Sequence, residues 1–126
     1  MAKILVADDE PEVLQFCAAA LKNEKHTLVF AETGPMTMEK LLTENPDLLV
    51  LDIMLPGIDG YSLQLRMEQD EKLSDIPVII ITALKPAQGL FEKFKQIKAF
   101  LAKPFSQTEL QNAVQDALVN KRSGNG

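Results

Sequence analysis

Asp47-Leu48-Leu49-Val50-Leu51-Asp52-Ile53-Met54-Leu55-Pro56-Gly57-Ile58-Asp59-Gly60 is the stretch that decides how this chain folds. Its apolar run, Leu48–Leu51, is too short for a helix and unbroken by polar residues, which predicts a central parallel strand covered on both faces. The run ends in a carboxylate, Asp52, and the proline and two glycines that follow predict a loop. Open α/β folds bind ligands at the carboxyl ends of parallel strands, so Asp52 is the first candidate for a functional residue.

Strand-like and helix-like segments alternate along the rest of the chain. Five alternations predict one α/β domain with a parallel sheet, right-handed crossovers and helices on both faces. The other predicted strands are Ile4–Ala7, Thr27–Ala31 (at an edge of the sheet), Val78–Ile81 and Ala99–Ala102. The first predicted helix begins at Pro11, and the next three span Met36–Glu44, Asp59–Glu71 and Pro86–Gln96. The last predicted helix is opened by a capping box at Ser106–Glu109.

The composition is that of an ordinary globular domain. The chain has 126 residues, 46% of them hydrophobic and 25% charged, which is enough to bury one core. A net charge of -5 argues against general nucleic-acid binding, and no apolar run approaches the ~20 residues of a membrane span. The first residues lack the features of a secretory signal, and Cys17 is the only cysteine, so we expect a cytoplasmic protein in which Cys17 is an inert buried thiol.

Four of the five predicted strands end in polar residues: Asp8 and Asp9, Asp52, Thr82, and Lys103. Because the carboxyl ends of parallel strands share one edge of the sheet, we expect these side chains to converge there. Clustered carboxylates are tolerated around a hard cation, and such oxygen ligands suit Mg²⁺. A carboxylate can also act as a nucleophile towards phosphorus, while the metal, hydroxyl and ammonium hold the phosphoryl oxygens.

Taken together, these motifs resemble those of the receiver domain of bacterial two-component response regulators. The resemblance covers Lys3 to about Asn120 and implies a flavodoxin-like, doubly wound (βα)5 sheet with strand order 2-1-3-4-5. It also implies a receiver domain over residues 1–120 and a polar tail over residues 121–126. The motifs are Ala7-Asp8-Asp9-Glu10, Leu51-Asp52-Ile53-Met54-Leu55-Pro56-Gly57-Ile58-Asp59-Gly60, Ile81-Thr82-Ala83 and Lys103-Pro104-Phe105.

The resemblance also implies a role for each residue of the acidic group. Asp52 is the expected phosphoacceptor. Asp9 binds Mg²⁺ directly, Asp8 binds it mainly through water, and the backbone carbonyl of Met54 completes the protein's share of the metal site. Met54 and Leu84 are also the side chains expected to shield the phosphoryl group from water, which predicts a long-lived phosphorylated state.

Three further residues are implied to hold and report the phosphoryl group. Thr82 bonds a phosphoryl oxygen, Lys103 pairs with the phosphate, and Phe100 is the aromatic switch whose rotamer follows the threonine. The expected output surface is formed by the fourth helix, fifth strand and fifth helix. The chain departs from the family at Gln96-Ile97-Lys98-Ala99, where members usually carry Gly-Ala and two polar residues, which leaves the pose of the fourth helix open.

The implied function is that of a signalling receiver. It accepts a phosphoryl group from a sensor histidine kinase or phosphotransfer protein and controls a downstream protein or output domain that the sequence does not name. It is not an enzyme beyond transfer to, and hydrolysis from, its own Asp52. We expect no direct nucleic-acid or membrane binding by this domain, and dimerisation on phosphorylation is compatible with the family.

Three alternatives stay open from the residues alone. A flavin-binding protein of this topology would place phosphate-cradling residues where Asp8, Asp9 and Glu10 would instead repel phosphate. A phosphatase of the haloacid dehalogenase type would need a second acid where Met54 stands. A docking module without phosphorylation is the third. Taken singly, the aspartates could cap a helix, and Lys103 could be a solvated surface residue.

Overall fold

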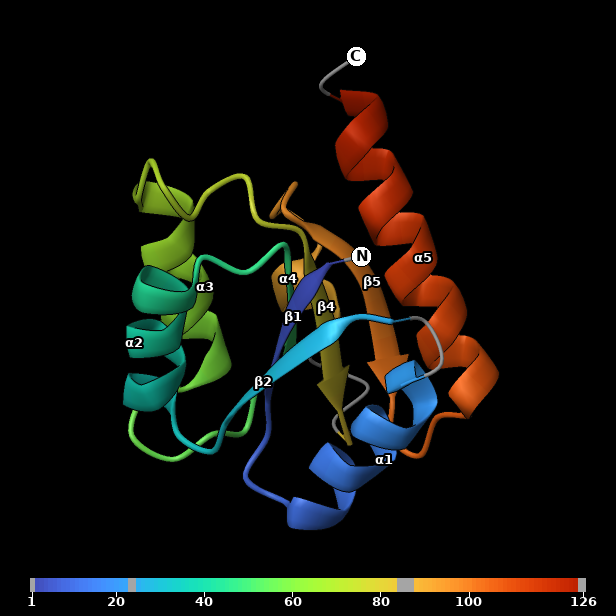
Figure 1. The fold of residues 1–126 in the computed structure, drawn as a ribbon. Coiled ribbons are helices and arrows are strands. Elements are labelled where there is room, and N and C mark those ends of the chain that lie inside the picture. The colour runs from blue at the N-terminus through green and yellow to red at the C-terminus, as the bar shows by residue number, and fades with distance from the viewer. Residues whose placement is uncertain (1, 23–24, 84–87, 125–126) are drawn as a thin grey trace.

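The computed structural model describes residues 2–22, 25–83 and 88–124, which form three layers. A parallel sheet lies between α1 and α5 on one side and α2 and α3 on the other (Figure 1). The strands are β1 (Lys3–Ala7), β2 (Thr27–Ala31), β3 (Leu48–Asp52), β4 (Val78–Thr82) and β5 (Ile97–Ala102). The helices are α1 (Pro11–Leu21), α2 (Gly34–Glu44), α3 (Gly60–Gln69), α4 (Gln88–Phe91) and α5 (Gln107–Gly124).

The sheet has the predicted doubly wound topology. Its order is β2-β1-β3-β4-β5, and every neighbouring pair is parallel. The unbroken apolar runs in β3 and β4 are buried at every position, as strands covered on both faces should be. β2 lies at one edge, as its more polar ends predicted.

Each face of the sheet carries its own hydrophobic core. On one face Leu41 of α2, Leu63 of α3 and Phe91 of α4 pack over the strands. On the other face Cys17 of α1 and Val114 of α5 do the same. The prediction of a buried Cys17 is confirmed, and burial raises the pKa of its thiol to about 12. No helix in the described ranges is long and apolar enough to cross a membrane.

The last helix begins as its sequence predicted. The backbone N–H of Glu109 donates to Ser106 Oγ, and the backbone N–H of Ser106 donates to Glu109 Oε1, both at 3.0 Å, which is a reciprocal capping box. The helical backbone continues to Gly124, so the first four residues of the predicted polar tail extend α5. A tail that begins at residue 121 stays a prediction.

The prediction of a fourth helix over Pro86–Gln96 is wrong at its C-terminal end, while residues 86 and 87 lie outside the described residues. Within the described residues α4 spans only Gln88–Phe91, and the apolar side chain of Leu90 is 61% exposed. Ile97 begins β5, which is two residues longer than the predicted strand Ala99–Ala102.

Tertiary hydrogen bonds explain why the helix is short. The side chain of Gln96 is buried, and its Nε2 donates to the carbonyls of Leu73 and Ile76 at 2.6 and 2.8 Å. Its Oε1 accepts from Nε2 of Gln64 in α3 at 2.8 Å. These bonds hold the chain before β5 against the loop before β4, and Gly89 weakens helix propensity further.

Gly60 lets the loop after β3 close tightly on the strand end. Its N–H donates to the carbonyl of Ile53 at 2.9 Å, and a Cβ at this position would overlap the Cα of Ile53. The loop therefore requires glycine where α3 begins.

We predict that Gly60→Ala destabilises the fold by about 1–3 kcal/mol, because the backbone of Ile53 has to move to admit a methyl group. Gly89→Ala is the matched control, since a Cβ there meets no atom within 4 Å and alanine favours the helix. Urea unfolding of the two variants measures the difference. Equal stability of both variants would contradict this account of the loop.

Candidate functional site

The carboxyl ends of the strands bring the predicted residues to one edge of the sheet. Asp52 ends β3 and pairs in register with Ile81, the residue before Thr82 in β4. Lys103 follows β5, and its backbone N–H donates to the carbonyl of Thr82 at 2.8 Å. Asp8 follows β1, the neighbour of β3 on its other side. The parallel register alone therefore assembles side chains that lie up to 95 positions apart in the sequence, from Asp8 to Lys103.

The ammonium group of Lys103 lies among three carboxylates at this edge. Nζ of Lys103 lies 2.8 Å from Oδ2 of Asp8, 2.9 Å from Oδ2 of Asp52 and 3.0 Å from Oε1 of Glu10. Asp8 and Asp52 are buried, and the side chain of Lys103 is only 14% exposed. The two pairs with aspartates are therefore screened less by water than an ordinary surface salt bridge, whereas Glu10 is exposed.

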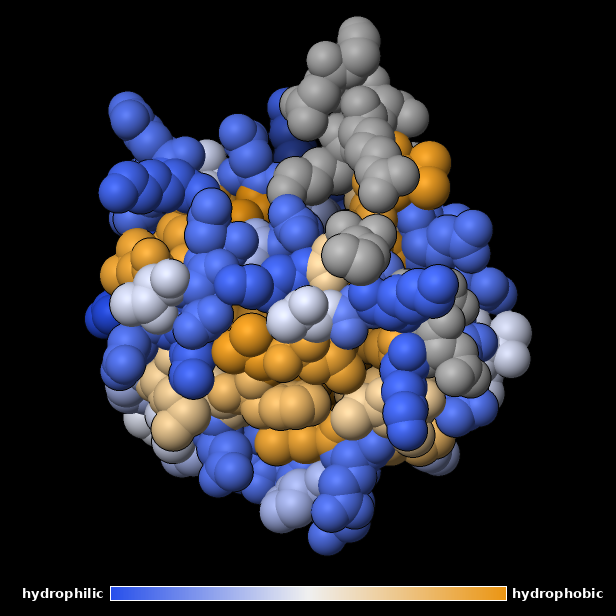
Figure 2. Space-filling model, viewed as in Figure 1, coloured by the Kyte–Doolittle hydropathy of each residue, from blue (hydrophilic) through white to orange (hydrophobic). Residues whose placement is uncertain are grey.

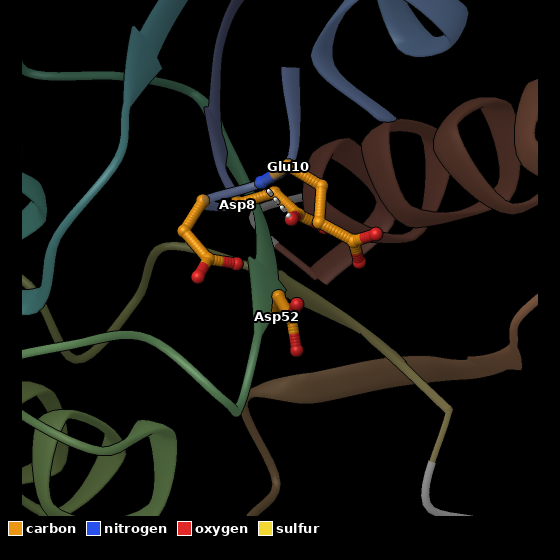
Figure 3. A group of neighbouring side chains, drawn as sticks. Asp8, Glu10 and Asp52 are labelled. Carbon is orange, nitrogen blue, oxygen red and sulfur yellow. Dashed lines mark hydrogen bonds between the residues drawn. The ribbon is translucent and has the colours of Figure 1, made fainter. Parts of the chain in front are cut away.

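Backbone N–H groups orient the two buried carboxylates. Oδ1 of Asp8 accepts from the N–H of Glu10, and Oδ1 of Asp52 accepts from the N–H of Met54, both at 2.9 Å. In each aspartate the other oxygen, Oδ2, is thereby directed to Lys103. Figure 3 shows Asp8 and Glu10, which follow β1, close to Asp52 at the end of β3.

The electrostatics of the site follow from burial and charge crowding. Burial raises the pKa of Asp8, and the nearby Asp52 carboxylate adds to the increase, although hydrogen bonds from Lys103 and Glu10 oppose it. Burial also lowers the pKa of Lys103, but hydrogen bonds to Asp8, Asp52 and Glu10 outweigh it, so the pKa of the ammonium is raised overall. Lys103 therefore stays charged at neutral pH and offsets part of the negative charge.

The loop after β3 is shaped by glycine and by a helix cap. Gly57 has φ of 91°, in the left-handed region that favours glycine, and the N–H of Gly34 donates to the carbonyl of Pro56 at 2.8 Å. Asp59 caps α3 through the N–H and Oγ of Ser62, both at 2.9 Å. The loop that carries Met54 is thus tied to the start of α2 and to α3.

The acidic residues fit a hard divalent cation. Asp8, Asp9, Glu10 and Asp52 each offer a carboxylate oxygen, and these oxygens lie within 4.8 Å of one another. Oδ2 of Asp8 is buried, and within the described residues its contact is the ion pair with Lys103. An all-oxygen set of ligands is the chemistry that Mg²⁺ prefers.

The predicted residues do not all have the same setting. Asp9 and Met54 are exposed, the latter at 58%, whereas Thr82 is fully buried at the end of β4. Phe100 is half-buried and lies outside the acidic group, with its ring centroid 6.5 Å from that of Phe91. Leu84 lies outside the described residues.

Sequence reasoning missed Glu10 as a partner of Lys103. The signal was present, because Glu10 directly follows the two aspartates and all three leave the same strand end. An exposed acid before Pro11 also resembles an ordinary residue of a first helical turn, so its position did not set it apart. The Lys103–Pro104 peptide bond, next to this contact, is cis.

Comparison with known families and proteins gives a consistent result. The family model described as the response regulator receiver domain matches residues 4–115. The chain is 29% identical over 119 residues to protein PilH of Pseudomonas aeruginosa, covering 94% of this chain and 98% of PilH. It is 32% identical over 111 residues to RpaA of Synechocystis, a DNA-binding dual master transcriptional regulator, covering 87% of this chain but 46% of RpaA.

Solved structures agree with these sequence comparisons. The response regulator TrrA of Thermotoga maritima, solved in complex with Mg²⁺ and BeF, has a TM-score of 0.83 and 30% identity to this chain. The match covers 94% of this chain and 100% of that structure. The fold, the strand-end acids and the family match lead to one conclusion: this chain belongs to the response-regulator receiver domains, a family of phosphorylatable signalling domains.

Proposed function

We propose that this domain accepts a phosphoryl group on Asp52 from a histidine kinase or phosphotransfer protein, with Mg²⁺ bound, and that the modification switches its α4–β5–α5 surface. The observation that carries this proposal is the contact between Oδ2 of Asp52 and Nζ of Lys103 at 2.9 Å. It places the only described cation of the acidic site directly beside the carboxylate at the end of the central strand. A phosphoryl group on Asp52 would therefore form next to a cation.

The chemistry is a direct displacement at phosphorus. An oxygen of the Asp52 carboxylate attacks the phosphorus, a new P–O bond forms, and the P–N bond to the donor histidine breaks with its electron pair left on the nitrogen. Catalysis of such a transfer consists mostly of positioning and neutralisation of charge. Lys103 and the Thr82 hydroxyl are the proposed partners of the phosphoryl oxygens.

Asp9, Asp52 and the Met54 carbonyl are the proposed protein ligands of the metal, with Asp8 acting mainly through water. When bound, Mg²⁺ supplies positive charge that stabilises the transferring phosphoryl group. The acidic group of Asp8, Asp9, Glu10 and Asp52 supports this assignment, and so does the similarity to TrrA, which was solved with Mg²⁺. Glu10 is near enough to contribute a further oxygen or to hold a metal-bound water.

The proposed switch runs from Thr82 to Phe100. Phosphorylation adds about 1.5–2 negative charges at Asp52, which can draw the hydroxyl of Thr82 towards the site and leave space for an aromatic ring to turn inwards. Phe100 is half-buried and lines a groove of about 240 Å³ between α4 and β5, so an inward turn of its ring would change the shape of this surface. The change is a shift between two existing states of one surface.

Met54 is the proposed brake on dephosphorylation. Its side chain is 58% exposed, two residues after Asp52, so it can cover a phosphoryl group without being fixed in the core. It offers no polar group to guide an attacking water. Leu84, the other residue proposed for this role, lies outside the described residues, so the argument for a long-lived phosphorylated state rests here on Met54.

The proposed partners are a sensor histidine kinase or phosphotransfer protein and a downstream protein or output domain. RpaA is DNA-binding, but this chain covers less than half of it and has a net charge of -5, so we assign no nucleic-acid binding to this domain. The proposal also includes a receiver domain over residues 1–120 and a cytoplasmic location without membrane binding. It further includes dimerisation on phosphorylation.

The first test is the site of modification. Incubation with acetyl phosphate and Mg²⁺ should add one phosphoryl group, measured by intact mass, and Asp52→Asn should abolish the addition because the nucleophile is lost. Asp59→Asn is the matched control, because Asp59 is an exposed helix cap in the same loop and asparagine caps equally well. Unchanged labelling of Asp52→Asn would falsify the assignment.

The second test is the role of the metal. EDTA should stop labelling, and Asp9→Asn should weaken Mg²⁺ binding by about 10-fold, or ~1.4 kcal/mol, because one charged ligand is lost. Isothermal titration measures the affinity, with Asp75→Asn as control. Asp75 is exposed and precedes β4, so it lies where the strand begins, away from the acidic site at the carboxyl ends. Labelling that proceeds equally well in EDTA would show that the metal has no part in the transfer.

A further inference from the structure

The outer edge of β2 carries exposed apolar surface. Figure 2 shows apolar side chains gathered in the centre of the face on which β2 lies in front. Leu28 and Val29 are half-buried and Phe30 is 37% exposed, although all three lie in the middle of the strand. An apolar edge strand of this kind is a template for pairing with another strand.

The backbone of β2 shows which groups face outwards. The N–H of Thr27 donates to Ala2 at 2.8 Å, and the carbonyl of Ala31 accepts from Asp8 at 3.0 Å, so these residues direct their polar groups towards β1. In a parallel strand this direction alternates from residue to residue. Leu28 and Phe30 therefore direct their N–H and C=O groups away from β1, outwards from the edge of the sheet.

We propose that β2 pairs in antiparallel fashion with β2 of a second copy of this chain, with the twofold axis at Val29. In this register Leu28 of each copy faces Phe30 of the other, and both residues use their outward N–H and C=O groups. Moving the axis to Leu28 or Phe30 would leave more of the outward groups in the strand unpaired. The result is one continuous ten-stranded sheet, twice the five strands of the single chain.

The residues at the two ends of β2 favour a second copy as the occupant. Lys25 and His26 precede the strand and Glu32 follows it, whereas the five strand residues carry no charge. Antiparallel pairing places the basic end of one copy beside the acidic end of the other, with His26 opposite Glu32. A parallel arrangement would place like ends together, so the strand is complementary to itself only in the proposed direction.

The side chains are compatible with this pairing on both faces. Leu28 belongs to the face covered by α1 and α5, and Val29 belongs to the face covered by α2 and α3. Pairing thus brings apolar side chains together on both sides of the new strand pair. A five-residue strand buries less than a standard interface of about 1,600 Å², so we expect a weak and reversible dimer. This interface is separate from Asp52 and does not require phosphorylation.

Cysteine cross-linking tests the register. In the proposed register the two copies of Val29 face each other without exchanging hydrogen bonds. Such a pair has Cα atoms about 4.5 Å apart, within the reach of a disulfide. Val29→Cys should form a disulfide-linked dimer on mild oxidation. Thr27→Cys, on the same face of the strand, should not form one. In the proposed register Thr27 of one copy faces Ala31 of the other, so the two cysteines would be four positions apart. Wild type is the control for Cys17, which is buried.

Sedimentation of the unmodified chain tests the association itself. The average mass should rise with concentration from 14.0 kDa towards twice that value, and Phe30→Lys should remove the increase. Leu90→Lys is the matched control, since it adds the same charge at an exposed apolar residue of α4, which lies towards the other end of the sheet. A wild type that stays monomeric, equal cross-linking of both cysteine variants, or a dimer abolished by Leu90→Lys but not by Phe30→Lys would each overturn the proposal.

Discussion

The contact of one ammonium group with three carboxylates is the interaction on which the functional edge of this domain depends. The fold places Asp8, Glu10 and Asp52 around Lys103 at 2.8–3.0 Å, and the two aspartates are buried. Buried carboxylates at such short separation repel one another strongly unless a cation lies between them. Lys103 supplies that cation from the end of β5, and this position explains why its pKa is raised despite burial. The site is therefore a place where positive charge is required, and a divalent metal and the ammonium can share that requirement.

The parallel sheet is what makes this arrangement available to a chain of 126 residues. Every strand runs in the same direction, so the residue that ends each strand reaches the same edge without a long or specialised loop. The tight loop after β3, closed by Gly60 and linked through Pro56 to the start of α2, then fixes the backbone of Met54 against Asp52. A buried, ion-paired acidic edge and a short α4 lie on the same scaffold. The proposed function uses both, with the phosphoryl group received at the acidic edge and the change reported at α4.

The sequence was informative wherever local pattern and topology agreed. Short apolar runs that end in Asp52 or Thr82 predicted both the strands and the edge at which the site forms, and the capping box at Ser106 predicted the start of α5. The extent of α4 could not be read in the same way, because it depends on hydrogen bonds from Gln96 to residues that lie 20 and 23 positions earlier in the chain. The part played by Glu10 was equally hidden, since its partner Lys103 is 93 residues away.

Replacement of Lys103 by methionine tests the central claim most directly, because it removes the cation and keeps much of the apolar volume of the side chain. Thermal and urea unfolding should be measured for wild type and Lys103→Met, each in EDTA and in excess Mg²⁺. In EDTA we expect the variant to be less stable by about 3 kcal/mol, because the buried carboxylates have lost their counter-charge. Mg²⁺ should recover most of that loss and should stabilise the variant more than the wild type. Equal stability of the two proteins in EDTA, with the same response to Mg²⁺, would contradict the view that a cation among these carboxylates organises the site.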